Sequence, residues 1–158
     1  MPTSTAILTP DQLLSHWQGH RRVTRRVIEA FPDEPFTQFA VGGMRPALGL
    51  ATEIVQMAEP TLEGVISNTW EQRDPRPAPT TKAAVLARWD EVTALLDRRW
   101  SEIPDARFQE RELAFGQWDM RMVDLLLYVI DNEIHHRGQL MTYLRALGVE
   151  PPAFYDRS

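Results

Sequence analysis

Residues 132–139 read NEIHHRGQ and place two histidines, an acid and an arginine inside an otherwise apolar helical pattern. Such groups are costly to bury unless they are paired or bind something. Because residues four apart share one face of a helix, Asn132 and His136 are expected on a common stripe among apolar neighbours. His135 falls on a second, more polar stripe. We therefore expect His136 to face the interior and His135 to face a flank or a partner.

Glu53 is the only charged residue in the run ALGLATEIVQMA at positions 47–58. A carboxylate facing a helical core needs a cation, a hydrogen-bond donor or a metal ion. Helical bundles commonly build metal sites from Glu and His side chains on facing helices. Glu53, Asn132 and His136 are therefore a candidate site. From the residues alone, a structural hydrogen bond between Glu53 and His136 is the favoured interpretation, because one Glu and one His are a weak metal signal.

Other polar pairs have a structural and a functional interpretation. Glu133 and Arg137 are four apart in the favourable order, so they are expected to form an ion pair along the helix. His16 and His20 have a spacing that could chelate a metal. Their neighbour Trp17 indicates a core-facing region, which favours simple packing of the two rings.

Two further groups of residues are expected to be structural. The arginines of helix residues 21–26 are expected on a solvated face, where they pair with acids. The tryptophans are expected in the core or at a dimer contact. The basic residues are Arg21, Arg22, Arg25 and Arg26, and the aromatic residues are Trp17, Trp70, Trp89, Trp100 and Trp118. A nucleic-acid partner at the arginines is a less favoured alternative.

Length and composition narrow the class of protein. A chain of 158 residues predicts a single domain over residues 1–158. The net charge of -5 disfavours nucleic acid, and the absence of cysteine excludes disulfides and cysteine nucleophiles. Residues 1–9 lack the pattern of a signal peptide, and no apolar stretch approaches the roughly 20 residues of a membrane span. These features predict a cytoplasmic protein.

The apolar periodicity predicts four helices, over about residues 11–30, 45–70, 81–103 and 119–147. Thr9-Pro10 and Thr81 are start signals, Gly148 is a stop signal, and Pro60 is expected to kink the second helix. The connection over residues 105–118 has room for a short extended piece. With no convincing strand alternation, the chain is predicted to be an all-α four-helix bundle.

The C-terminal motifs resemble those of the DinB-like (DinB/YfiT) family. They are HHRGQL at 135–140, YLR at 143–145 and GVEPP at 148–152, and residues 45–57 resemble the second helix of the family. The resemblance implies a four-helix bundle with up-down-down-up order, often dimeric, in which three histidines bind a divalent metal. Some members are thiol-dependent S-transferases and others metal-dependent hydrolases. The family name reflects induction by DNA damage, which implies a stress response.

Two of the three family ligands differ in this chain. His136 matches the last histidine, whereas Asn132 and Glu53 stand where the family has histidines. Glutamate is a competent metal ligand and asparagine a poor one. The resemblance implies zinc, nickel or manganese at Glu53, Asn132 and His136, an unknown small-molecule substrate, an external low-molecular-weight thiol and a homodimer. The alternative is a metal-free binding or stress-response protein without catalytic activity.

Overall fold

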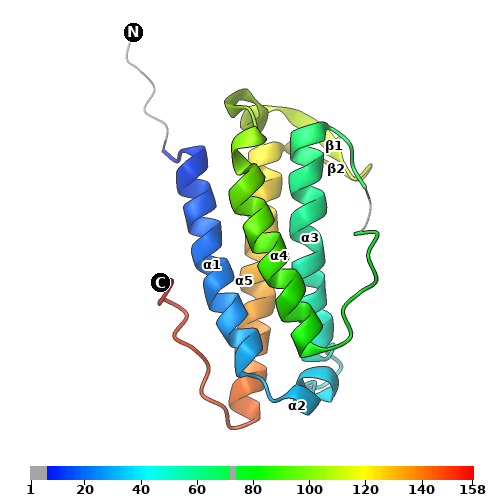
Figure 1. Cartoon of the computed structure of the whole chain (residues 1–158), viewed down its shortest axis with the longest axis vertical. Coiled ribbons are helices and arrows are strands. Elements are labelled where there is room, and N and C mark those ends of the chain that lie inside the picture. The colour runs from blue at the N-terminus through cyan, green and yellow to red at the C-terminus, as the bar shows by residue number, and fades with distance from the viewer. Residues whose placement is uncertain (1–6, 72–73) are drawn as a thin grey trace.

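Four long helices make up most of the computed structural model, which describes residues 7–71 and 74–158. They are α1 (Pro10–Ala30), α3 (Ala47–Ser67), α4 (Lys82–Arg99) and α5 (Met122–Ala146), and they lie side by side (Figure 1). Helices α1 and α5 run in one direction and α3 and α4 in the other, and both α1 and α3 contact α4 and α5. The predicted mainly helical fold is therefore confirmed.

The helix ends follow the sequence signals. At the start of α1, the Thr9 hydroxyl accepts from the Gln12 N–H at 3.2 Å, while Gln12 Oε1 accepts from the Thr9 N–H at 2.9 Å. The Thr81 hydroxyl accepts from the Ala84 N–H at 3.1 Å at the start of α4. These bonds satisfy N–H groups that lack a partner within the helix. Gly148, with a φ of 76°, follows the last turn of α5.

Side chains from all four long helices fill the core between them. Trp17 and Trp89 are fully buried there and Trp100 nearly so, whereas Trp118 is half-exposed. Helix α3 continues through Pro60, which is itself buried. The tryptophans are therefore core residues for the most part, and Trp118 is an exception that lies on a short hairpin.

That hairpin replaces the expected start of the last helix. Strands β1 (Arg111–Ala114) and β2 (Trp118–Arg121) pair antiparallel, so α5 begins at Met122 rather than near residue 119. In the turn, Phe115 and Gly116 have φ angles of 52° and 67°. Tight hairpin turns require such angles and favour Asn-Gly or Asp-Gly, so Phe-Gly is a weak sequence signal. The short extended piece expected in this connection is confirmed.

Three further short helices lie in the described ranges. They are α2 (Asp33–Gln38), which was not predicted, and two 3-10 turns, η1 (Trp100–Glu102) and η2 (Asp105–Gln109). Within the two described ranges, none of the helices is both long and apolar enough to cross a bilayer. The expectation of no signal peptide falls mainly on residues 1–6, which lie outside the described residues.

Candidate functional site

The structure brings the three predicted site residues together between α3 and α5. Glu53 Oε1 lies 3.0 Å from His136 Nε2 and accepts a hydrogen bond from Asn132 Nδ2 at 3.2 Å. His136 is buried, whereas His135 is exposed, as their different helical stripes predict. The apolar stripe of α5 therefore places Asn132 and His136 against α3 and leaves His135 outside.

Two residues that the sequence did not single out complete this polar cluster. Arg45 Nη1 lies 2.5 Å from Glu53 Oε2, and Gln139 Oε1 lies 3.0 Å from His136 Nδ1. Gln139 belongs to the HRGQ motif, so the motif carried a signal for it. Arg45 precedes α3 in a connection and carried none.

These contacts change the pKa of the Glu53 carboxyl group. Partial burial alone would raise its pKa. Hydrogen bonds from Arg45, then from Asn132 and His136, outweigh burial and hold this pKa below its usual value. Glu53 is therefore an ionised hydrogen-bond acceptor at neutral pH.

Glu53 faces a cavity of about 820 Å³ that opens between α3 and the connections on either side of it. Its side chain is 32 % exposed, whereas His136 is almost buried behind it. The cavity is lined by Thr37, Arg45, Pro46, Leu48, Gly49, Thr52, Glu53, Gln56, Met57, Asp74, Arg76, Ala78 and Pro79. A molecule entering this space therefore reaches Glu53 and Arg45 before His136.

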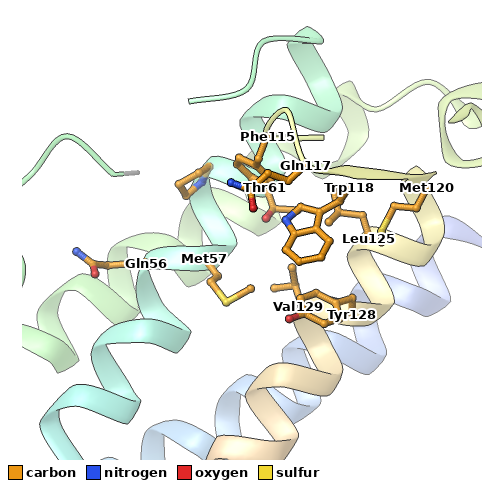
Figure 2. A pocket seen from close by; sticks show the side chains of 11 residues that line it. Gln56, Met57, Thr61, Phe115, Gln117, Trp118, Met120, Leu125, Tyr128 and Val129 are labelled. Atoms are coloured by element: carbon orange, nitrogen blue, oxygen red, sulfur yellow. The ribbon is translucent and has the colours of Figure 1, made fainter. Parts of the chain in front are cut away.

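A second, apolar cavity of about 330 Å³ adjoins the first between α3, α5 and the hairpin (Figure 2). Gln56 and Met57 line both cavities. The other residues around the apolar cavity are Pro60, Thr61, Phe115, Gln117, Trp118, Met120, Leu125, Tyr128 and Val129. The hairpin residues among them were not expected at a site, because only the tertiary fold brings them to α3.

The donor atoms of the cluster fit a divalent ion in part. Two ligands of one tetrahedral zinc ion lie roughly 3.3 Å apart, as bonds of about 2.0–2.1 Å require. The 3.0 Å separation of Glu53 Oε1 and His136 Nε2 is close to this. However, Asn132 directs its NH₂ group at Glu53, and Arg45 already neutralises that carboxylate. In the described part of the chain, no three His, Cys, Asp or Glu side chains converge. The set is therefore incomplete for a metal.

A second polar cluster lies on a different face of α5, against α1. Glu133 accepts from Trp17 Nε1 at 3.2 Å and from the Thr24 hydroxyl at 2.6 Å. Arg137 donates to the Thr24 hydroxyl at 3.3 Å and to the His20 carbonyl at 3.1 Å. Among the described contacts, Thr24 links Glu133 to Arg137 and no direct ion pair joins them. The expected pair along the helix is therefore wrong, because both side chains reach across to α1.

His16 and His20 behave as packed rings. Their centroids are 4.6 Å apart in an edge-to-face arrangement, and His20 is buried with its Nδ1 3.1 Å from Arg137 Nη2. Burial, and then the Arg137 charge, lower the pKa of His20 to about 4. A neutral ring bonded to Arg137 supports the packing interpretation rather than chelation.

The arginines of α1 divide between the core and the surface. Arg21 is fully buried, stacks on Trp89 at 4.2 Å and donates to the Thr93 hydroxyl. Arg25 is partly exposed and pairs with Asp90 at 2.7 Å. The expected solvated face is thus wrong for Arg21, because the flat guanidinium stacks on an aromatic ring and its Nε and Nη2 donate to the Thr93 hydroxyl.

Comparisons with known proteins place the chain in a family. It is 24 % identical over 152 residues to the Bacillus subtilis (strain 168) protein YrdA, covering 93 % of this chain and 88 % of the other. A crystal structure of a DinB-like protein from Bacillus cereus ATCC 10987 superposes with a TM-score of 0.73 at 24 % identity, covering 92 % of this chain and 97 % of the other. The DinB family model matches residues 1–158, and the chain therefore belongs to the DinB family.

Proposed function

We propose that this DinB-family chain is a small-molecule-binding protein whose ligand places a polar group against Glu53 and Arg45, without requiring a metal. The observation that carries the proposal is the hydrogen-bonded cluster around Glu53, which faces a cavity of about 820 Å³. Arg45, Asn132 and His136 hold the carboxylate in place of a metal ion. Polar groups fixed in this way at the wall of a cavity are typical of ligand sites.

The opposite charges of Glu53 and Arg45 determine which kind of polar group in a ligand fits the cluster. Glu53 is an ionised acceptor, and Arg45 is a donor that remains half-exposed. A carboxamide complements both, since its NH₂ donates to Glu53 and its oxygen accepts from Arg45. A cation would be repelled by Arg45, and a carboxylate would be repelled by Glu53. The proposal therefore favours a neutral group that both donates and accepts.

A matched set of three aromatic probes tests this preference. Benzamide, benzamidine and benzoate share a ring and differ in the charge of the polar group. We expect benzamide to bind most tightly in titrations followed by NMR, with shifts near residues 45–57. The Glu53→Gln variant should lose that preference, because its side chain presents a donor and an acceptor in place of a carboxylate. Equal binding of the three probes would contradict the proposal.

A metal-dependent hydrolase or S-transferase is the second candidate. It is favoured by the separation of Glu53 Oε1 and His136 Nε2, and by the buried Oδ1 of Asn132, which has no hydrogen-bond partner among the described residues. Exchanging the amide oxygen and nitrogen of Asn132 would turn that oxygen towards the two other ligand atoms, Glu53 Oε1 and His136 Nε2. Zinc, nickel or manganese would then have these three ligands, and a transferase would need an external thiol.

Calorimetric titration separates the two candidates. Protein purified without a histidine tag and stripped with a chelator would be titrated with zinc, nickel and manganese chlorides. We expect no uptake of one equivalent tighter than roughly 1 µM, or about -8 kcal/mol. Uptake of one equivalent that is lost in both Glu53→Gln and His136→Gln would support the metalloenzyme instead.

The helix order is also a proposal. We assign the four long helices to the up-down-down-up bundle of the family. The shared direction of α1 and α5, opposite to α3 and α4, supports this assignment (Figure 1). In that order the first and last helices are neighbours, as their contacts require.

A further inference from the structure

We propose that the apolar cavity between α3, α5 and the hairpin binds a flat, uncharged ring of the ligand. The inference rests on the proposed function, because Gln56 and Met57 line both this cavity and the one that Glu53 faces. Met57 follows Glu53 by one helical turn, which is about 6 Å along the axis. One molecule is therefore able to place a polar group at Glu53 and a ring beyond Met57.

The lining of the cavity excludes charge from the ring. Of the described residues around it, none is charged, and its polar groups are amides and hydroxyls, such as those of Gln117 and Thr61. A charged group entering this space would lose water without gaining a partner of opposite sign. The volume of about 330 Å³ matches a small organic molecule and is at the lower end of known ligand pockets.

Two large aromatic side chains form the outer wall. Trp118 is 48 % exposed and Tyr128 is 49 % exposed, and their rings stack with centroids 6.5 Å apart and an interplanar angle of 29°. Figure 2 shows the Trp118 indole close to Tyr128, with Met57 projecting towards them from α3. A flat ring placed here covers aromatic surface that otherwise stays in water.

Methionine sulfur atoms favour an aromatic ring over a saturated one. Met57 and Met120 line the cavity from α3 and from β2. Thioether sulfur is polarisable and makes favourable contacts with aromatic rings, while the flexible side chain adapts to the shape of the ligand. The aromatic faces and the two thioethers together favour a planar ring in the ligand.

The hairpin is fixed in the position that closes this cavity. Phe115 has a φ of 52°, a left-handed conformation that is costly for a bulky side chain and recurs at ligand clamps. Its ring packs edge-to-face on Trp70 at 4.9 Å. Trp70 in turn lies against Gly64, where an added Cβ would come within 2.1 Å of the indole. The strained turn is thus anchored to the end of α3.

Two naphthalene alcohols test the inference. 2-Naphthol is flat, and decahydro-2-naphthol has the same carbon skeleton and hydroxyl but is puckered. Each would be titrated into protein labelled with ¹³C at the methionine methyl groups. We expect 2-naphthol to shift the Met57 and Met120 signals saturably and to leave the distant Met141 unchanged, and decahydro-2-naphthol to bind at least about fivefold more weakly.

Alanine variants locate the binding. Trp118→Ala should weaken 2-naphthol about tenfold, whereas Leu113→Ala, an exposed position on β1 that is not among the described lining residues, should leave its affinity unchanged. No saturable shift of Met120, equal binding of the two alcohols, or equal effects of the two variants would overturn the inference. Failure of benzamide with success of 2-naphthol would refute the proposed polar site and leave the ring site standing.

Discussion

Helix α5 carries two polar clusters, on two faces about 100° apart around the helix and within about two turns. Asn132 and His136 face α3, and Glu133 and Arg137 face α1. The cluster on α1 is closed, because Glu133 and Arg137 are both less than 5 % exposed and bond groups on α1. The cluster on α3 opens to a cavity through Glu53, which is about one-third exposed.

The comparison shows that access to solvent, rather than residue type, separates the two clusters. In the closed cluster an unpaired charge has no water to replace a lost partner, so each group matters for stability. In the open cluster, solvent and ligands are able to take the place of a lost bond. We infer that the closed cluster fixes the packing of α1 on α5 and the open cluster recognises ligands.

Loss of Glu133 should have the largest effect on stability. Glu133→Ala should destabilise the fold by about 3–5 kcal/mol, because the donors of Trp17 and Thr24 lose their buried acceptor and the buried charge of Arg137 loses the nearby carboxylate. Glu53→Ala should cost about 1 kcal/mol or less, because its partner Arg45 is half-exposed. Urea unfolding curves would measure both. Similar losses for the two variants would refute the distinction.

A pH dependence should come from the closed cluster. The pKa of His20 is about 4 in the fold and about 6.5 when unfolded, so the unfolded chain binds more protons between these values. The stability that His20 contributes by staying neutral is fully present above pH 6.5 and is lost as pH falls towards 4, by up to about 3 kcal/mol.

The His20→Gln variant isolates the contribution of His20 to the pH dependence of stability, because glutamine keeps an acceptor for Arg137 but does not titrate. The difference in free energy of unfolding between the wild type and His20→Gln should shrink from pH 7 to pH 4. A difference that stays constant with pH would show that His20 is not held neutral. Comparing the two proteins removes the acid effects of other groups that they share.

The two adjacent histidines test the open cluster itself. His136→Ala should destabilise by about 1–2 kcal/mol, because it leaves a buried gap and removes a partner of Glu53 and Gln139. His135→Ala should stay within about 0.5 kcal/mol, since His135 is exposed. Thermal melts of both variants would decide this. Equal effects would contradict the assignment of the two side chains to different stripes.

A histidine at position 132 should bring the open cluster closer to the three-histidine set that the family resemblance implies. Asn132→His places two imidazoles four residues apart, facing Glu53, and should raise zinc or nickel affinity by about tenfold, or about 1.4 kcal/mol. The gain should be largest above pH 7, where protons compete least for imidazole. Calorimetric titration at matched pH would measure it. An intact fold with unchanged affinity would mean that position 132 is not a ligand position.

Local signals determined the long helices and three residues of the site, Glu53, Asn132 and His136. Periodicity and capping residues such as Thr9 and Thr81 located the long helices, because these signals act within a few residues. Helical spacing also separated His136 from His135, since the positions of side chains around one helix follow from its 3.6-residue repeat. The residue substitutions at Glu53 and Asn132 were visible in the sequence, and so was the family resemblance.

The tertiary structure decided how these residues are partnered. Glu133 and Arg137 have the spacing of a helical ion pair, yet both bond Thr24 on α1, because a buried polar group bonds the acceptor or donor that packing brings nearest. Arg45 reaches Glu53 from a connection, and Trp118 lines the same cavity as Met57 from a hairpin whose Phe-Gly turn packs on Trp70. Such contacts join positions far apart in the chain. Local propensity does not encode them, and only the packed fold creates the cavities that they line.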